Sequence, residues 1–298
     1  MKILIIGAGG MLGRDLQPIL SLRHEVIGTD FHDLDITQIR PTRDAIDSLR
    51  PDVVINLAAI TDVDGCESQK ERAFAVNAQG ALHVARGCAA AGARLIHLST
   101  DYVFDGTSKD PYTEEAQPRP LNVYGKSKLL GERGVQEAGG DSLILRTAWL
   151  YGRYGKNFVD TILRLSSEQD EIRVVNDQRG SPTCTRDLSR AIEELLGRGE
   201  NGIMHVTNSG SCTWFEFAGK ILALKGPGDP PVRLLPISSA ELGRPARRPA
   251  NSVLDCSKFE RIARWKMRNW EESLREYLDN PLGGSGAPKP SLGPTSSP

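Results

Sequence analysis

The sequence predicts an α/β fold in which a doubly wound parallel sheet carries a smaller lobe near its carboxyl edge. Short apolar runs alternate with stretches of helical spacing over residues 1–177, and repeated strand–helix alternation is typical of parallel sheets. The first apolar run ends in a glycine-rich turn. After about residue 177 the alternation loosens into Pro-, Gly- and Arg-rich connections, which indicates a second, smaller lobe.

The expected strands are short and almost continuously apolar, as strands buried on both faces are. "KILIIG" (2–7) is the first, and the helical stretch "MLGRDLQPIL" follows it. Helix-forming residues at helical spacing fill the connecting segments, notably 67–91 and 122–137. The remaining strands of this series are expected at 24–30, 51–59, 93–100, 142–152 and 171–177.

The composition argues against several classes of protein. Net charge is −1, with 37 basic and 38 acidic residues interspersed, so we expect neither nucleic acid nor an anionic membrane as partner. Apolar runs such as "DVVINLAAI" fall short of the ~20 residues that span a bilayer, and residues 1–6 lack the features of a signal peptide. The five cysteines are scattered without metal-ligand spacing. We therefore expect a cytoplasmic protein with reduced cysteines.

The turn after the first strand has the pattern of a dinucleotide site. "GAGGMLG" (7–13) places Gly7, Gly10 and Gly13 in a G-x-x-G-x-x-G spacing where the first helix opens. Glycines let the backbone approach a pyrophosphate, which then lies at the positive end of the helix. A merely structural turn is the alternative, but its position at the first strand–helix turn favours a Rossmann-type site. Met11 and Leu12 belong to the same predicted site.

Asp30 closes the second strand, 17 residues after Gly13. An acid there would bind the adenosine ribose hydroxyls and repel a 2′-phosphate, which favours NADH. A solvated strand-end aspartate is the alternative, so the choice between NADH and NADPH stays open. The rest of the predicted cofactor site follows the second and third strands: Asp35, Ile36, Ala58, Ala59, Ile60 and Thr61.

The chain is expected to divide into two interleaved domains. Residues 1–177 would form the dinucleotide-binding domain, and about 178–282 mainly a substrate-binding lobe. Because "GIMHVT" (202–207) still has the pattern of a strand, a return segment of about 186–208 should belong to the first domain. Residues 283–298 are nearly all Gly, Pro and Ser, which predicts a flexible tail.

The candidate chemistry lies at the end of the fourth strand and on the next helix. "LSTDYVFDG" (98–106) places Thr100 at the carboxyl edge, and Tyr124 precedes Lys128 by four positions. Positions i and i+4 share one helix face, so the pair is either an acid with its activator or a surface pair. An ammonium at ~4 Å would favour the phenolate by about 4 kcal/mol, or roughly three pKa units.

A strand-end hydroxyl followed by Tyr-x-x-x-Lys, downstream of the glycine turn, resembles the extended short-chain dehydrogenase/reductase family. Five strings are similar to dTDP-4-dehydrorhamnose reductases, in the same order: "STDYVFDG", "PLNVYGKSKLLGE", "LRTAWLYG", "VNDQRGSPT" and "ARRPANSVLD". The resemblance runs from residue 1 to about 280. It implies NAD(P)H-dependent reduction of the 4-ketone of a dTDP-linked 6-deoxyhexose, which gives dTDP-L-rhamnose.

The resemblance also implies a role for each matching residue. Tyr124 would protonate the alkoxide that forms as hydride reaches C4, and Lys128 would also bind the nicotinamide ribose. Thr100 would hold the ketone oxygen or the phenol. The substrate would further contact Asp101, Trp149, Asn157, Arg247 and Arg248. For the last four, the alternatives are a core tryptophan, a helix cap and two surface arginines.

Other polar residues are not expected to take part in catalysis. His97 and His205 lie inside apolar strands and are expected to be core histidines. Tyr102 and Tyr112 lack the lysine spacing and are expected in packing or loops. Magnesium occurs in some relatives, but Arg186 stands where a relative carries an acid, so no metal site is predicted.

Two other functions remain open. The chain could reduce another nucleotide-linked 4-ketosugar. It could instead be a catalytically silent subunit, because the regulatory subunit of methionine adenosyltransferase has strings similar to "DYVFDG" and "YGKSK". The intact set of Thr100, Tyr124 and Lys128, together with Trp149 and "ARRPANS", favours an active enzyme over the silent subunit. The sequence does not fix the oligomeric state, and a homodimer is one candidate.

Overall fold

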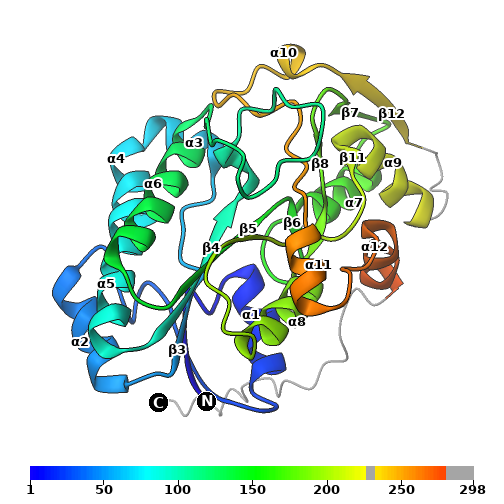
Figure 1. Cartoon of the computed structure of the whole chain (residues 1–298). Coiled ribbons are helices and arrows are strands. Elements are labelled where there is room, and N and C mark those ends of the chain that lie inside the picture. Colours follow the sequence, from blue (N-terminus) through cyan, green and yellow to red (C-terminus); the bar gives the residue numbers. More distant parts are fainter. Residues whose placement is uncertain (226–231, 280–298) are drawn as a thin grey trace, which may run out of the picture.

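A computed structural model describes residues 1–225 and 232–279 and has a six-stranded parallel sheet at its centre (Figure 1). The strands lie in the order β10-β5-β4-β3-β1-β2, and each neighbouring pair is parallel. The predicted tail at 283–298 lies outside the described residues. The strand bounds are β1 Lys2–Ile6, β2 Glu25–Thr29, β3 Val53–Asn56, β4 Arg94–Thr100, β5 Ser142–Thr147 and β10 Gly202–His205.

Helices cover both faces of this sheet. One face packs against α1 (Met11–Leu20), α8 (Thr185–Leu196) and α11 (Ser257–Ala263). The other packs against α2 (Ile39–Leu49), α5 (Ala81–Ala91) and α6 (Val123–Ala138). Successive residues of a strand point to opposite faces, and β1 accordingly sends Ile3 and Ile5 into the first core and Leu4 and Ile6 into the second. The predicted Rossmann-type fold is confirmed.

The strand order reverses between β1 and β3, which creates the crevice where open α/β sheets bind ligands. The turn that connects β1 to α1 lies at this point. A Cβ atom on Gly7 would be 2.9 Å from the Ala58 backbone nitrogen, so the turn is in close contact with the segment that follows β3. The fold therefore places the glycine turn at the sheet's switch point.

A second, smaller core lies beyond the main sheet. Here β7 (Glu171–Val175) pairs in parallel with β12 (Arg233–Ile237), over a core formed with α7 (Phe158–Glu168), α9 (Trp214–Lys225) and α12 (Trp270–Asp279). The expectation that 171–177 continues the central sheet is wrong, because β10 occupies the place next to β5. The return strand near 202–207 is present as β10, whereas the division of the chain near residue 177 stays a prediction.

Short elements complete the described chain. Two-stranded pairs form between β6 (Leu150–Tyr151) and β9 (Thr183–Cys184), and between β8 (Arg179–Gly180) and β11 (Cys212–Thr213). The remaining helices are α3 Val63–Ser68, α4 Lys70–Phe74, the π-helix η1 Ala75–Gly80, the 3₁₀-helix η2 Asp101–Val103 and α10 Ser239–Leu242. Most of these lie on connections at the carboxyl edge of the sheet, where they shape the site.

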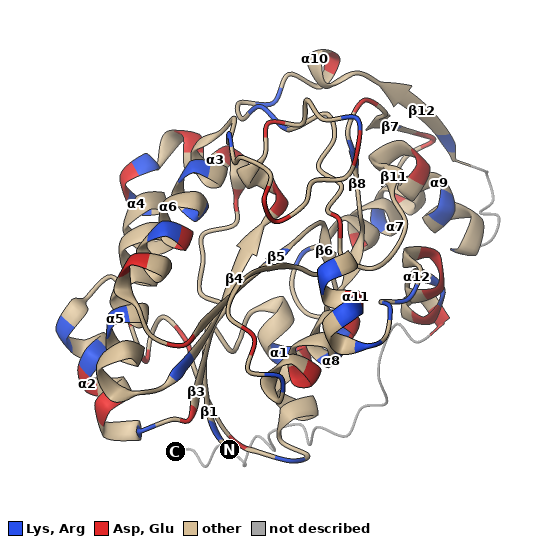
Figure 2. Cartoon of the chain, viewed as in Figure 1, with Lys and Arg blue, Asp and Glu red and all other residues tan. Residues whose placement is uncertain are grey.

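Basic and acidic residues are interspersed along the described helices (Figure 2). This distribution agrees with the net charge of −1. None of the described helices combines the length and the apolar character needed to cross a membrane.

A buried ion pair joins α6 to the sheet. Arg146 of β5 and Glu132 of α6 are each 1% exposed. The guanidinium donates to both carboxylate oxygens, at 2.9 and 2.6 Å, and the Ser99 hydroxyl of β4 donates to Glu132 Oε1 at 2.5 Å. Because every carboxylate hydrogen bond comes from a strand, the pair fixes α6 against β4 and β5.

Replacing Glu132 alone should destabilise the fold severely. Glu132→Gln leaves the buried Arg146 charge without its counter-ion, which costs about 3–5 kcal/mol. The matched double variant Glu132→Leu/Arg146→Met removes both charges and should recover most of that loss. Chemical denaturation measures the free energy of unfolding of both variants. Equal stability of wild type and Glu132→Gln would contradict a stabilising role of the ion pair.

Candidate active site

A cleft of about 550 Å³ lies at the carboxyl ends of β1, β2 and β3. It is bordered by the glycine turn, the end of β2 and the segment after β3. Predicted cofactor residues that line it are Gly7, Gly10, Asp30, Asp35, Ile36, Ala58, Ala59 and Ile60. Arg72 of α4 also lines it, and sequence spacing gave no sign of that residue.

The glycine turn leaves no room for side chains. Gly7 has a φ of +85°, a conformation that other residues rarely adopt. A Cβ on Gly13 would lie 2.5 Å from the Ala8 carbonyl oxygen. Beside the turn, Asp30 Oδ1 accepts a hydrogen bond from the Gly9 backbone nitrogen at 2.8 Å. The backbone can therefore approach a pyrophosphate closely, with the acid fixed at the edge of the turn.

A buried asparagine holds the segment that follows β3. Asn77 of η1 accepts a hydrogen bond from the Ile60 nitrogen at 2.8 Å and donates to the Ile60 carbonyl oxygen at 3.0 Å. Its amide also donates to Ser127 of α6 at 3.0 Å. The wall of the first cleft is thereby connected to the helix that carries Tyr124 and Lys128.

A second cleft of about 440 Å³ adjoins the first and shares Gly7, Gly10 and Ala59 with it. The predicted residues that line this second cleft are Met11, Leu12, Gly13, Thr61, Thr100, Asp101, Tyr124, Lys128 and Trp149. The predicted acid, its lysine and the strand-end hydroxyl thus face one space that continues into the glycine turn. Tyr124 and Lys128 are not a surface pair, because the Lys128 side chain is buried and only 3% exposed.

The two predicted catalytic side chains of α6 are both affected by burial. Burial raises the pKa of the Tyr124 phenol, and the neighbouring Thr100 hydroxyl partly offsets the rise. Burial also lowers the pKa of Lys128 to about 8, against an opposing influence of Glu132. The Lys128 ammonium donates to the Leu98 carbonyl oxygen at 2.5 Å.

The expected lowering of the Tyr124 pKa by Lys128 is not found. The physical reason is that loss of solvation penalises the phenolate and outweighs the stabilising influences on it. The phenol therefore stays protonated across the neutral range, which is the state a proton donor requires.

Thr100 lies at the junction of β4 and η2. Its hydroxyl donates to Asp101 Oδ1 at 3.0 Å and accepts from the Tyr102 backbone nitrogen at 3.2 Å. The Tyr102 ring lines the cleft and makes an edge contact with Tyr124, with ring centroids 5.8 Å apart. Tyr102 was expected in packing or a loop, so the structure adds it to the site.

Two stacked tryptophans form one wall of the second cleft. Trp149 and Trp214 have ring centroids 3.5 Å apart and an interplanar angle of 5°, and Phe158 packs on Trp214 at 4.5 Å. Trp149 has a φ of +47°, an uncommon backbone conformation for a bulky residue. Trp149 was predicted from sequence, whereas Trp214 was not, because it lies 65 residues later on α9.

The predicted arginines interact mainly with the protein itself. The Asp64 carboxylate of α3 accepts hydrogen bonds from two guanidinium nitrogens of Arg248, at 2.7 and 2.8 Å. It also accepts one from a guanidinium nitrogen of Arg244, at 3.0 Å. These contacts hold the pKa of Asp64 well below its usual range. Arg247 is exposed, and its carbonyl oxygen accepts from Asn122, the N-cap of α6, at 2.7 Å. The 244–248 segment is thus fixed beside α6.

Asn157 is placed as the cap of α7. Its Oδ1 accepts from the Asp160 nitrogen at 3.0 Å, and its amide donates to the Gly152 carbonyl oxygen at 2.9 Å. It is not among the residues that line either cleft. The neighbouring Lys156 does line the second cleft. This loop therefore brings a positive charge to the cleft through a residue that the sequence did not predict.

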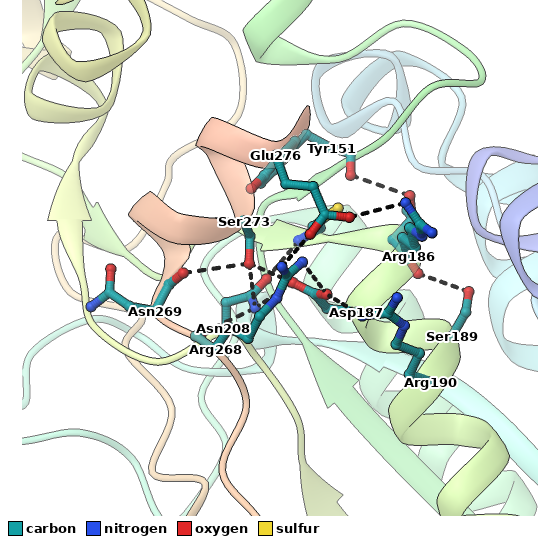
Figure 3. Close-up of polar contacts among 12 residues, drawn as sticks. Tyr151, Arg186, Asp187, Ser189, Arg190, Asn208, Arg268, Asn269, Ser273 and Glu276 are labelled. Atoms are coloured by element: carbon teal, nitrogen blue, oxygen red, sulfur yellow. Dashed lines mark hydrogen bonds and ion pairs between the residues drawn. The ribbon is translucent and has the colours of Figure 1, made fainter. Parts of the chain in front are cut away.

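Arg186 lies in an ion-pair network away from the clefts, between α8 and α12 (Figure 3). Glu276 pairs with Arg186 at 3.0 Å and with Arg268, and Arg268 also pairs with Asp187 at 2.6 Å. The acids therefore face guanidinium groups. Within residues 1–225 and 232–279, no group of three or more His, Cys, Asp or Glu side chains is arranged to hold a metal ion.

Both strand histidines are buried, as expected. His205 is bonded to the Tyr112 carbonyl oxygen at 3.0 Å, and burial with the nearby Arg146 charge lowers its pKa to about 3. His97 contacts the Asn56 amide at 3.2 Å, and its Nε2 has no hydrogen-bond partner. Burial also lowers the pKa of His97, so both rings are neutral at physiological pH.

Comparison with known proteins agrees with this geometry. Residues 1–282 match the sequence pattern of the RmlD substrate binding domain. The chain belongs to this family. The resemblance to dTDP-4-dehydrorhamnose reductases that the five strings indicated is thereby confirmed, since curated relatives of that name are about 40% identical over most of the chain.

Three relatives show how far the similarity extends. The dTDP-4-dehydrorhamnose reductase of Streptomyces griseus is 42% identical over 294 residues, or 96% of each chain. The dTDP-4-keto-6-deoxy-D-glucose reductase of Streptomyces niveus is 40% identical, covering 92% of this chain and 95% of that one. The structure of the Bacillus anthracis dTDP-4-dehydrorhamnose reductase in complex with NADP has a TM-score of 0.89 and 40% identity, covering 94% of this chain and 99% of that one.

Gly13→Ala should weaken both the fold and dinucleotide binding. Alanine gains at most about 1 kcal/mol of helix propensity, but its Cβ would overlap the backbone of Ala8, and such overpacking costs about 1–3 kcal/mol. The net effect is therefore unfavourable, and titration calorimetry should show weaker NADPH binding.

Gly197→Ala is the matched control, because a Cβ there meets no atom within 4 Å. Its stability should change by less than about 0.5 kcal/mol. If both variants bind the dinucleotide like wild type, the turn does not cradle a pyrophosphate.

Proposed function

We propose that this protein is an NAD(P)H-dependent reductase that converts the 4-keto group of dTDP-4-dehydrorhamnose to the alcohol of dTDP-L-rhamnose. The observation that carries the proposal is that Thr100, Tyr124 and Lys128 line the same cleft as the glycine turn. Relatives named dTDP-4-dehydrorhamnose reductase support the choice of substrate. The intact triad disfavours the silent regulatory subunit.

The residues of the first cleft fit a dinucleotide. Cβ atoms on Gly7 and Gly13 would overlap the backbones of Ala58 and Ala8, so this tight turn requires glycine, and the amino end of α1 supplies backbone donors for a pyrophosphate. Asp30 and Asp35 line this cleft and are the proposed ligands of ribose hydroxyls. When bound there, NADH or NADPH supplies the hydride. The Asp30 carboxylate alone does not determine whether the site prefers NADH or NADPH.

Protonation of the product is the task of α6. Tyr124 donates its phenolic proton to the alkoxide that develops at C4, and its raised pKa keeps that proton available. The charged Lys128 lies one turn away on the same face, and its proposed role is to bind the nicotinamide ribose beside the phenol. Thr100 donates a hydrogen bond to the ketone oxygen. Carbon–hydrogen bond formation and proton donation together convert the carbonyl to a hydroxyl.

The wall of the second cleft suits a sugar nucleotide. The Trp149 side chain would contact the hexose, and Trp214 keeps that ring fixed through stacking. Lys156 at the cleft edge supplies positive charge for a diphosphate. Arg248 stays a proposed diphosphate ligand, although Asp64 competes for its guanidinium, and Arg247 remains a proposed ligand at the exposed edge. We assign Asn157 to positioning of this loop.

A reductase of another dTDP-linked 4-ketosugar is the second candidate. Relatives at about 40% identity carry names for different ketosugars, including dTDP-4-keto-6-deoxy-D-glucose. Turnover of separate dTDP-4-ketosugars, compared by kcat/KM, distinguishes the two. A cytoplasmic location and a homodimer stay predictions of the sequence, and light scattering of the purified chain tests the second.

Tyr124→Phe should lower the rate of NAD(P)H oxidation with dTDP-4-dehydrorhamnose by about 10²–10⁴-fold, because the phenylalanine has no proton to donate. Cofactor binding should stay near the wild-type value, since the ring and its packing remain. Stopped-flow absorbance with saturating cofactor measures the loss.

Tyr112→Phe is the matched control, because that hydroxyl donates to Asp105 at 3.0 Å and lies outside both clefts. A Tyr124→Phe variant that retains wild-type turnover would overturn the assignment of the proton donor.

The pH dependence of kcat/KM should reflect the ionisation of Lys128. Lys128 with a pKa of about 8 is charged below that pH and becomes neutral above it, so kcat/KM should fall as pH rises through about 8. In Lys128→Arg the side chain keeps its charge at this pH. The variant should be slower than wild type, and its kcat/KM should not fall near pH 8. A Lys128→Arg profile that still falls near 8 would assign the titration to another group.

A further inference from the structure

Asp101 is a buried acid beside the Thr100 hydroxyl, and the proposed reaction gives its charge no task. The residue is 2% exposed and lines the second cleft. Oδ1 accepts the Thr100 hydroxyl hydrogen at 3.0 Å. The other oxygen, Oδ2, is buried and has no hydrogen-bond partner. An ionised carboxylate with an unpaired buried oxygen is costly, so this geometry favours the neutral acid.

The Thr100 hydroxyl has one proton and two lone pairs. One lone pair accepts the Tyr102 backbone N–H at 3.2 Å. While the carboxylate of Asp101 accepts the single proton, Thr100 cannot donate to a ketone in the cleft. A protonated Asp101 can reverse this bond, donating from Oδ1 to the second lone pair. The Thr100 proton then turns toward the cleft.

The surroundings of Asp101 support a neutral state near pH 7. Burial raises the pKa of Asp101 to about 7, against smaller lowering influences of Ser252, Thr100 and the adjacent backbone. The Ser252 hydroxyl itself bonds to the Arg179 carbonyl oxygen at 3.4 Å. Its help to the carboxylate is therefore limited.

Other titratable groups lie near Asp101 on η2, α6, α3 and the 244–248 segment. Tyr102 of η2 and Tyr124 of α6 have raised pKa values and are neutral near pH 7. Lys128 of α6 faces the same cleft. The guanidinium of Arg248, in the 244–248 segment, influences Tyr102, and it is paired with Asp64 of α3 at 2.7 Å. Burial is the largest influence on the carboxyl.

We propose that the protonation state of Asp101 sets the direction of the Thr100 hydroxyl: the neutral acid lets Thr100 donate to the ketone oxygen, and the carboxylate withdraws that donor. Asp101 is a positioning residue, because it acts through Thr100. Its own proton stays in the hydrogen bond during turnover, and the proton that reaches C4 oxygen comes from Tyr124. This inference rests on the proposed ketone reduction.

The wild-type pH profile tests the inference without any substitution. Besides the fall assigned to Lys128, kcat/KM should show an earlier fall as pH rises through about 7, where Asp101 ionises. Asp101→Asn replaces the acid by an amide whose N–H₂ donates to Thr100 at every pH, so its profile should lack the earlier fall. A wild-type profile with only one fall, near 8, would overturn the proposal.

Thr100→Val supplies the matched control. It removes the donor itself and should lower kcat by about 10²-fold, with no fall near 7, since Asp101 then has no hydroxyl to turn. If Asp101→Asn keeps the earlier fall, a different group titrates and the proposal is wrong.

Infrared difference spectroscopy of the purified protein separates this inference from the proposed function. The carbonyl stretch of a protonated carboxylic acid should disappear as pH rises through about 7 and should be absent in Asp101→Asn. If the ketosugar is never reduced but this band titrates near 7, the proposed function fails and the buried neutral acid stands. A carboxyl that titrates near ~4, the ordinary value for aspartate, overturns the inference.

Discussion

The arrangement of the site depends on one close approach, that of the first turn of α6 against η2. A Cβ atom on Gly125 would overlap the Tyr102 carbonyl oxygen, so glycine is required where the helix meets the end of β4. Asn122 caps this turn by accepting from the Gly125 nitrogen at 2.8 Å, and Glu67 of α3 accepts from the Val123 nitrogen at 2.8 Å. These contacts place Tyr124 beside Thr100.

An ion pair holds the other end of the α6 face that carries Tyr124 and Lys128. Glu132 lies one turn beyond Lys128 and is paired with Arg146 and Ser99 at 2.5–2.9 Å. Burial favours the neutral lysine, whereas the carboxylate favours the ammonium. The helix is thus fixed at its amino end by packing and further along by an ion pair, and the acid and its lysine lie between the two.

Much of the fold, and the set of residues that line the proposed cofactor cleft, followed from local patterns. The helix expected at "MLGRDLQPIL" is α1, and the glycine turn lies at the switch point, because strand–helix alternation and glycine spacing act over short distances. The strand at 171–177 formed but joined β12 in a second sheet. Distant segments compete to pair with the edge strand of a sheet, and the periodicity of a sequence does not predict which segment pairs there.

The sequence by itself determined the α/β class, the glycine cradle and the Tyr124–Lys128 face, since each depends on residue type and short spacing. Tertiary structure alone decided which polar groups share the cleft. It brought Trp214 onto Trp149, engaged Arg248 with Asp64, and buried Asp101 beside Thr100 with one oxygen unpaired. These facts depend on burial and on contacts between segments far apart in the chain, and burial is what changes the pKa of an acid.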